Sequence, residues 1–433
     1  MSDAVPGDAL NFDALDVAAE AEVVVVGGGP GGLCAAVAAA EEGADTLLIE
    51  RYGFLGGMAT AGLVNPFMTW HAGGRPIIRG LFERITERLD GYGGWGGPRR
   101  PSAFDDEFFK FVAEDLCEEA GVRLQLHTML AGVEAAGGRV GRIATLSKSG
   151  LRAVGGEVFI DGTGDGDLAA WAGAEVEIGR EEDGHCQPMT LCFRMMNVEI
   201  DRMPSRTDIN ALYDAAKERG EIDNPRENVL LFYTTHEDEV HFNTTRVVMH
   251  DATDAEELTD AELIARKQVR QMVRFLIAEV PGFENAWLEE MAPQIGIRES
   301  RRIMGDHVLS VDEVLGASKF DDGIARGSYS VDIHNPAGTG TVIKRLPPGE
   351  AYDIPYRCLT PRGFDNLLIA ARCVSADHGA HSSLRVMPIV MAIGEAAGCA
   401  AEMALEDGDT RAVDVDALRE RLVARGASIH GME

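Results

Sequence analysis

The feature that most constrains the fold is a glycine cluster that follows a short run of valines. The stretch EVVVVGGGPGGLCAAVAAAEEGADTLLIE places Gly27, Gly29 and Gly32 in a G-x-G-x-x-G pattern. The pattern alone is weak evidence, because 50 of the 433 residues are glycine. Its context makes it specific, since the cluster follows a strand predicted at 23–26 and opens a helix predicted to end near Glu42.

Each glycine of the pattern has a physical role in binding a dinucleotide. The first permits a tight turn, the second lets a pyrophosphate approach the backbone, and the third lets the helix pack on the strand. The amides at the helix N-terminus then face the phosphates. A second predicted strand, 46–49, leads to Glu50, whose carboxylate would accept hydrogen bonds from ribose hydroxyls. The sequence therefore predicts a dinucleotide-binding unit near the N-terminus.

The segment after Glu50 favours FAD over NAD as the dinucleotide. In RYGFLGGMATAGLV a second loop of small residues follows the carboxylate almost at once. Such a loop suits close passage of the backbone along a ribityl chain and flavin ring, whereas a nicotinamide dehydrogenase more often continues into a third regular βα unit. No second G-x-G-x-x-G follows a predicted strand, since Gly338–Gly340 falls in a predicted loop. We therefore expect FAD as the cofactor and no separate NAD(P)H domain.

Two later segments suit the same cofactor. The stretch GEVFIDGTGDGDLAAWAG predicts a strand at 157–160, a glycine–aspartate turn and a helix. The stretch FDNLLIAARCVSADHGAHSSLRVMPIVMAIGEAAG predicts a strand at 367–370, a polar loop and a long helix with Pro388 in its first turn. The positive end of that helix would face N1 and O2 of the flavin, where the reduced ring carries its negative charge.

Several blocks together resemble the FAD-dependent oxidoreductase family, a branch of the glutathione-reductase-like flavoproteins. They are the glycine cluster with Glu50 and Arg51, then GFLGGMATAGLV, QPMTLCFRM, GIRESRRIMGDHVL, IPYRCLTPRGFDNLLIAARCVSA and HSSLRVMPIVMAIGEAAG. The resemblance spans residues 22–404 and implies bound FAD in a two-domain fold, without fixing a substrate. The residues expected to bind the cofactor are Gly27, Gly29, Pro30, Gly31, Gly32, Glu50, Arg51, Gly57, Met58, Ala59, Thr60, Gly164, Asp165, Arg372, Met387 and Pro388.

The predicted fold class is α/β, with a discontinuous Rossmann-like FAD-binding domain and an α+β substrate or cap domain. Short alternating strands with glycine turns between residues 121 and 160 predict an antiparallel β-meander on the FAD domain. The predicted divisions are a loose tail at 1–20, an FAD domain at 21–65, 105–175 and 350–410, a substrate domain at 66–104 and 176–349, and a C-terminal helix at 411–433. Residues 66–104 carry aromatics and arginines between glycines, which suits either a lid over the flavin or an ordinary surface loop.

Candidate proton acceptors follow from the chemistry of flavin dehydrogenation, which needs a base beside the reacting C–H bond. His378 and His381 come first, because they lie in the predicted loop before the flavin-facing helix. Hydrogen bonds from them to FAD or to the loop backbone are an equal alternative. His71, beside Trp70, is a second choice, and for His241 on an alternating strand packing is favoured over a substrate contact.

Arginines are candidates for binding or protonating a substrate. Arg298, Arg301 and Arg302 in GIRESRRIMG suit paired hydrogen bonds to a carboxylate, and at least one is expected to be a structural ion-pair partner instead. Arg385 likewise suits either a contact to a substrate carboxylate or a structural ion pair. Arg298 and Arg385 join the three histidines His378, His381 and His71 as candidate catalytic residues.

Charge and composition restrict the partners. A formal net charge of −31 argues against nucleic acid and anionic membrane surfaces. Seven cysteines without a C-x-x-C pair, and histidines without metal-ligand spacing, predict neither a dithiol site nor a metal site. The opening segment has no basic or apolar region typical of a signal peptide, so we expect a cytoplasmic protein. A homodimer and an electron-accepting partner protein stay open.

Three functions fit these features. The first is an FAD-dependent dehydrogenase or oxidase that takes hydride from a small polar metabolite and passes electrons to oxygen, a quinone or a carrier rather than to NAD(P). The second is a flavin-dependent reductase of an activated C=C bond, which is suggested by the GGMATAG loop and by arginines that could donate a proton. The third is an FAD-bearing electron-transfer subunit of a larger assembly, which the ordinary hydrophobicity makes least favoured.

Overall fold

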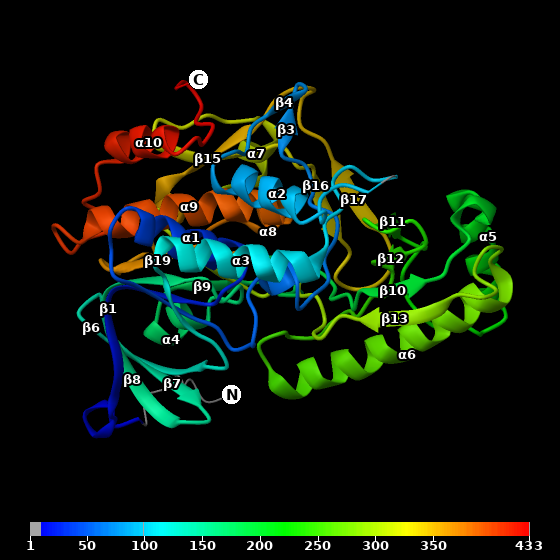
Figure 1. Ribbon diagram of the computed structural model, residues 1–433, viewed down its shortest axis with the longest axis horizontal. Coiled ribbons are helices and arrows are strands. Elements are labelled where there is room, and N and C mark those ends of the chain that lie inside the picture. Colours follow the sequence, from blue (N-terminus) through cyan, green and yellow to red (C-terminus); the bar gives the residue numbers. More distant parts are fainter. Residues whose placement is uncertain (1–9, 98, 433) are drawn as a thin grey trace.

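The computed structural model describes residues 10–97 and 99–432 of the chain (Figure 1). Two hydrophobic cores organise these residues, a large one around a seven-stranded sheet and a smaller one around a four-stranded sheet. In Figure 1 the smaller core lies on the right, with helices α5 (Arg206–Glu218) and α6 (Ala255–Glu279).

The seven-stranded sheet combines a parallel half with an antiparallel meander. Its order is β5-β2-β1-β8-β7-β6, and β19 also pairs with β8. Strands β5, β2, β1, β8 and β19 pair in parallel, whereas β6, β7 and β8 pair antiparallel. This is the α/β arrangement with a meander that the sequence predicts. The strands are β1 (Val17–Val26), β2 (Thr46–Ile49), β5 (Arg123–Gln125), β6 (Met129–Ala136), β7 (Arg139–Ser147), β8 (Gly150–Asp161) and β19 (Leu367–Ile369).

The N-terminal strand is longer than the sequence suggests. The apolar run Val23–Val26 is almost fully buried, as expected for a parallel strand covered on both faces. However, β1 begins at Val17 and pairs with β8 from Ala153 onward. The prediction of a loose tail is therefore wrong for residues 17–20, because their backbone groups complete the sheet. Residues 1–9 lie outside the described part of the chain.

Helices α1 (Pro30–Glu41) and α9 (Met387–Ala404) pack closely against each other over the parallel half of the sheet (Figure 1). A Cβ atom added at Gly394 would lie 2.1 Å from the Gly31 carbonyl oxygen, and one at Gly398 would lie 2.2 Å from the Ala35 oxygen. Glycine therefore sets the distance between the two helices. By length and apolarity α9 is the one helix among the described residues that meets the criteria for a membrane span, yet 83% of it is buried inside the protein.

The smaller core is a four-stranded antiparallel sheet covered by α5 and α6. Its order is β11-β12-β10-β13. The buried residues of this core fall between Met189 and Ile297, with Leu63 added from the N-terminal part of the chain. Its strands are β10 (Phe193–Met196), β11 (Leu231–Tyr233), β12 (Val240–Phe242) and β13 (Trp287–Met291).

The two cores divide the chain differently from the predicted domains. Phe67, Phe82 and Phe104 pack together in the large core, so residues 66–104 do not form a separate lid. A helix that the sequence analysis missed, α2 (Leu81–Gly91), lies in this segment. Residues from Ile303 to Val331 also join the large core, and so does Leu418 of α10 (Val415–Ala424).

The remaining elements connect these layers. The helices are α3 (Asp106–Ala120), α4 (Asp167–Ala172), α7 (Val311–Leu315) and α8 (His378–Leu384), with short 3₁₀ turns η1 (Phe12–Ala14), η2 (Gly57–Ala59), η3 (Ile200–Arg202) and η4 (Tyr356–Cys358). The strands are β3 (His71–Ala72), β4 (Arg75–Pro76), β9 (Val176–Ile178), β14 (Arg301–Ile303), β15 (Gly323–Gly327), β16 (Val331–His334), β17 (Thr341–Lys344) and β18 (Tyr352–Pro355).

Candidate functional site

A cleft lies at the carboxyl ends of the parallel strands. Val26 and Ile49 end β1 and β2, Gly162 follows β8, and Ala371 follows β19 shortly afterwards; all four residues line the cleft. Ligands of open α/β sheets bind at this edge, where chain connections run to opposite sides of the sheet. The glycine cluster is therefore in the position that a dinucleotide requires.

The glycines of the cluster serve two different purposes. A Cβ atom at Gly31 would lie 2.0 Å from the Ala370 oxygen, and one at Gly32 would lie 1.9 Å from the Gly27 oxygen. These two glycines are required by the packing of the protein itself. At Gly29 the nearest protein atom would be 3.8 Å from an added Cβ, which is ordinary contact, and Gly29 lines the cleft. The open space at Gly29 is what close approach of a pyrophosphate needs, so the cluster fits the cofactor.

Glu50 is oriented by the backbone around it. The Gly28 amide donates to its Oε2 at 2.7 Å and the Tyr52 amide donates to its Oε1 at 2.9 Å. The carboxyl group is buried, with 6% of the residue exposed, and borders the cleft. Each oxygen keeps a lone pair for a ribose hydroxyl. Beside it, Arg51 Nη2 donates to Gln294 Oε1 at 2.5 Å, which closes the rim of the cleft.

The turn after β8 is held by a buried carboxylate. Asp161 accepts hydrogen bonds from the Thr163 amide at 2.9 Å and the Ala169 amide at 2.9 Å. Burial raises the pKa of Asp161, although these donors act in the opposite direction. Asp165 accepts from Ser300 Oγ at 2.5 Å and from Arg372, so Arg372 is fixed over the turn.

Twelve of the predicted cofactor residues line the cleft and four do not. Gly32 serves helix packing, and the Thr60 hydroxyl donates to the Leu55 carbonyl at 2.8 Å. Ala59 and Thr60 are each 1% exposed and lie behind the glycine loop. Pro388 sits in the first turn of α9, behind the lining residue Met387. The lining residues among the predictions are Gly27, Gly29, Pro30, Gly31, Glu50, Arg51, Gly57, Met58, Gly164, Asp165, Arg372 and Met387.

Some cleft residues carry no sequence signal that singles them out. Thr128, Met129 and Leu130 line the cleft at the start of the meander, and Gln294 reaches it from the smaller core. Meander strands have no fixed motif, and the meander is brought to the cleft by the pairing of its last strand, β8, with the distant β1.

A second cavity of about 430 Å³ adjoins the cleft. The two share Met58, Arg372, Arg385 and Met387, so both spaces open on the same side chains. The other walls of the second cavity come from the smaller core and from the hairpin of β16 and β17. A flavin ring reaching these four side chains would therefore face the second cavity.

Arg298 lines the second cavity as predicted for a substrate-binding arginine, whereas its neighbours in the sequence do not. Arg298 donates to neutral oxygens only, to Pro188 O at 2.7 Å, to Thr190 Oγ1 at 2.5 Å and to Asn243 Oδ1 at 3.0 Å. Arg301 pairs with Asp167 at 2.7 Å, and Arg302 pairs with Glu299 at 2.6 Å. Arg301 and Arg302 are thus the structural ion-pair partners.

The structure does not bring the predicted histidines into either cavity. His378 and His381 lie on helix α8 rather than in a loop, and His378 Nδ1 lies 2.9 Å from Glu299 Oε1. His381 is completely buried with no hydrogen-bond partner for either ring nitrogen, and burial lowers its pKa to about 3. His71 is exposed on β3, away from both linings. None of the three lines either cavity, so the geometry gives no support to their assignment as the base. His241 is fully buried in β12, as the packing interpretation expects.

An acidic group of the second cavity was missed. Asp332 lines the cavity and accepts from the Tyr329 hydroxyl at 2.9 Å. His334 Nδ1 lies 3.3 Å from Arg246 Nη2, and because a guanidinium only donates, this nitrogen is the acceptor. The ring proton is then on Nε2, which lies 3.6 Å from Asp332 Oδ2. The segment carrying Asp332 has the pattern of an ordinary hairpin strand, and no motif singles this residue out.

Comparisons with solved structures give distant similarities. A geranylgeranyl bacteriochlorophyll reductase-like protein from Thermoplasma acidophilum is 17% identical with a TM-score of 0.47, over 94% of this chain and 84% of that one. The p-nitrophenol 4-monooxygenase PnpA from Pseudomonas putida DLL-E4 is 10% identical with a TM-score of 0.47, over 94% and 84%. The L-proline dehydrogenase from P. horikoshii is 12% identical with a TM-score of 0.45, over 95% and 99%.

No curated protein sequence matches the chain. A family model does, and it covers residues 22–422, which include the glycine cluster, Glu50, both cavities and helix α9. The family match agrees with the geometry of the first cleft. There Gly29 faces open space and backbone amides hold the Glu50 carboxylate, which fits a dinucleotide. The chain is a flavoprotein of the FAD dependent oxidoreductase family.

Proposed function

We propose that this FAD-dependent oxidoreductase is a dehydrogenase or oxidase that removes a hydride from a small polar metabolite. The observation that carries the proposal is the second cavity, which meets the FAD cleft at Met58, Arg372, Arg385 and Met387. FAD bound in the cleft would accept the hydride at N5 and later pass two electrons to oxygen, a quinone or a carrier. The side chains of the second cavity are then left to hold the substrate and to receive its proton.

Asp332 is the proton acceptor that we propose. Its carboxylate lines the cavity, and within the described residues it forms no ion pair with an arginine or lysine. The Tyr329 hydroxyl and the His334 ring hold one side of it, at 2.9 Å and 3.6 Å. A free carboxylate oxygen remains for the O–H or N–H proton of a substrate as the hydride leaves.

A nicotinamide cofactor is not proposed as the electron acceptor. The described residues contain one sheet with parallel strands, and the cleft at its edge is the one already assigned to FAD. The remaining sheets pair antiparallel and do not form a second dinucleotide-binding unit. From the sequence we also propose a cytoplasmic location and a single small-molecule substrate. We propose no nucleic-acid or membrane partner, and a homodimer or an acceptor protein stays a proposal.

Anaerobic bleaching of the FAD-loaded protein tests the proposed function. Alcohols, amines and saturated acids are added one at a time, and the absorbance at about 450 nm is followed, where oxidised flavin absorbs. At least one of these compounds is expected to bleach the protein, and air or a quinone should restore the colour. Bleaching by NADH or NADPH alone, with no response to any other compound, would refute the proposal.

A reductase of activated C=C bonds is the second candidate, and Arg298 is the observation that favours it. Burial, together with the charges of Arg385 and Arg226, lowers the pKa of this guanidinium to about 9, which makes it a better proton donor than an ordinary arginine. Protein reduced by light would then be reoxidised by an enoate and not by quinones. Reoxidation by quinones alone would eliminate this candidate.

A further inference from the structure

The second cavity has an unusual excess of unpaired arginine. Arg226, Arg298 and Arg385 all line it, and none of the three forms an ion pair within residues 10–97 and 99–432. Elsewhere buried arginines have carboxylate partners, as Arg194 has Asp106 and Arg302 has Glu299. In a chain with a net charge of −31, three arginines that line one cavity and form no ion pair with its acids leave room for an anion from outside.

Arg298 is the best defined of the three. It is only 9% exposed, and its three hydrogen-bond acceptors are a carbonyl, a hydroxyl and an amide oxygen. These groups accept three hydrogen bonds from its five N–H donors without neutralising its charge. Burial and the neighbouring charges of Arg385 and Arg226 lower its pKa, so a bound anion would relieve both effects.

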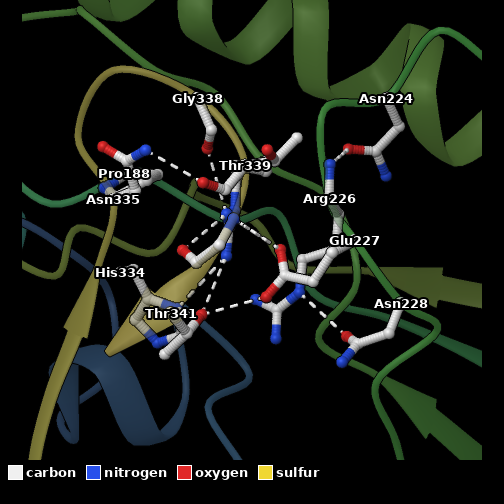
Figure 2. A network of polar contacts seen from close by, with 12 residues as sticks. Pro188, Asn224, Arg226, Glu227, Asn228, His334, Asn335, Gly338, Thr339 and Thr341 are labelled. Atoms are coloured by element: carbon white, nitrogen blue, oxygen red, sulfur yellow. Dashed lines mark hydrogen bonds and ion pairs between the residues drawn. The ribbon is translucent and has the colours of Figure 1, made fainter. Parts of the chain in front are cut away.

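Arg226 and Arg385 each keep a buried donor without a partner. Arg226 is 4% exposed, its Nε donates to Asn228 Oδ1 at 3.2 Å, and its Nη1 has no acceptor. Figure 2 shows Arg226 beside Asn228, with His334 and Thr341 across from them. The Nε of Arg385 is likewise buried without an acceptor, and Arg385 is shared with the FAD cleft. An unsatisfied buried donor costs free energy that a ligand oxygen would recover.

The acids of the cavity do not cancel these charges. Glu227 lies 3.0 Å from Arg246, a fourth arginine just behind the wall, and also accepts from the Thr341 hydroxyl at 3.0 Å. Asp332 faces Tyr329 and His334. The nearby carboxylates are therefore engaged with groups other than the three unpaired arginines.

Apolar side chains form part of the remaining lining, beside polar ones such as Asn65, Thr190 and Asn228. Cys192, Leu230, Phe232 and Ile297 contribute to the wall, and a cavity of about 430 Å³ exceeds what a bare inorganic anion would fill. Apolar walls beside a few fixed polar groups are typical of sites for an organic ligand whose orientation is set by one charged end.

We propose that the second cavity binds a carboxylate attached to an apolar body, with the carboxylate held by Arg298 together with Arg226 and Arg385. This inference rests on the proposed function in one respect, since the bound carboxylic acid would be the substrate of that reaction. Planar guanidinium groups match a carboxylate through paired N–H donors, which suits arginine at these three positions.

Binding without turnover tests this inference. Benzoate, its neutral isostere benzamide, and inorganic phosphate are titrated into the FAD-loaded protein by calorimetry, with the flavin absorbance as a second signal. Benzoate is expected to bind at least about 10-fold more tightly than benzamide, because only benzoate is charged. Phosphate should bind more weakly than benzoate, because it lacks the apolar body. Equal binding of benzoate and benzamide, or tighter binding of phosphate, would overturn the proposal.

Variants locate the carboxylate. Arg226→Met, Arg298→Met and Arg385→Met should each weaken benzoate by about 10- to 100-fold and leave benzamide within about twofold. Arg362→Met is the matched control, because Arg362 pairs with Glu175 at the surface and lines neither cavity. Melting temperature and FAD content are measured for every variant, and Arg298→Lys replaces Arg298→Met if the latter does not fold. Unchanged benzoate affinity in folded, FAD-loaded variants would contradict the assignment.

The two proposals fail in different ways. If a neutral alcohol or amine bleaches the protein while benzoate does not bind, the dehydrogenase stands and the carboxylate site is wrong. If benzoate binds through the three arginines while only NADPH bleaches the protein, the carboxylate site stands and the dehydrogenase is wrong.

Discussion

At the scale of single residues, the glycine cluster combines two requirements that a motif cannot separate. Gly31 and Gly32 are needed because an added Cβ atom would lie only 2.0 Å and 1.9 Å, respectively, from a backbone oxygen. Gly29, in contrast, faces open space in the cleft. The pattern in the sequence is the same for both kinds. The structure distinguishes the glycines that maintain the fold from the one that admits a ligand.

This distinction predicts opposite effects for two alanine substitutions. Gly32→Ala should lower the melting temperature strongly, because its Cβ would lie 1.9 Å from the Gly27 oxygen. Gly29→Ala should leave the melting temperature of the FAD-free protein nearly unchanged and weaken FAD by about tenfold or more, since its Cβ fills the space of the pyrophosphate. Thermal unfolding and flavin content check both. Full FAD affinity in Gly29→Ala would contradict this interpretation.

Asp332 carries the second residue-scale prediction. Asp332→Asn should reduce kcat by about 10²- to 10⁴-fold, because an amide cannot accept the substrate proton. FAD content should be retained, and benzoate should bind no more weakly, because the substitution removes a negative charge from the cavity that holds the anion. Asp416→Asn, at an acid whose side chain is 90% exposed, is the control and should keep full activity. Unchanged turnover in Asp332→Asn would remove it as the base.

Histidine is the expected base because it titrates near neutral pH, but the predicted histidines line neither cavity. His381 is buried away from the cavities, and His378 is engaged with Glu299. Asp332 can be recognised as a cavity residue only in the folded structure, where the β16–β17 hairpin lies against the arginine-lined wall. Arg298 and Arg385 lie within recognisable family blocks of the sequence, whereas their lack of an ion-pair partner among the described residues is seen only in the structure.

At the scale of secondary-structure elements, local patterns predicted the FAD-binding half well. The valine run, the helix that starts at Pro30 and the strand before Glu50 match β1, α1 and β2, because each signal lies within one short segment. Helix α2 and the division between the cores were missed. Both depend on packing between distant segments, such as Phe67 against Phe82 and Phe104.

The contact between α1 and α9 gives a prediction at this scale. Gly394→Ala should lower the free energy of unfolding by about 1–3 kcal/mol, because its Cβ would lie 2.1 Å from the Gly31 oxygen and push the helices apart. FAD affinity should fall as well, since Gly31 lines the cleft. Gly91→Ala, at a helical glycine with no atom within 4 Å of an added Cβ, is the control. Equal stability of the two variants in denaturant unfolding would contradict the packing argument.

At the scale of the whole molecule, buried neutral histidines make stability depend on pH. Burial lowers the pKa of both His241 and His381 to about 3, against 6.5 for an ordinary histidine. Above pH 6.5 both states of the protein hold these rings neutral. Below it the unfolded chain takes up protons first, so the free energy of unfolding falls as the pH drops towards 3, by about 1.4 kcal/mol per pH unit and histidine at most.

Acidic groups with raised pKa act in the opposite direction. Burial raises the pKa of Glu290 to about 7, so its contribution to stability grows as the pH falls from 7 towards its ordinary value of 4.5. The test is therefore a difference between proteins. Relative to the unmodified chain, His241→Gln and His381→Gln should each flatten the fall in melting temperature between pH 6.5 and 4.5. Parallel curves for variant and unmodified protein would show that these rings do not resist protonation in the fold.

The measurement that tests the whole account most directly is the absorption spectrum of the purified protein before and after acid precipitation. The family membership and the cleft at Gly29 and Glu50 predict a yellow protein whose band at about 450 nm passes into the supernatant as FAD, about one per chain. Colour that stays with the pellet would mean a covalent link. A colourless protein that cannot be reconstituted with FAD would contradict the assignment of the cleft and, with it, the function proposed for the cavity beside it.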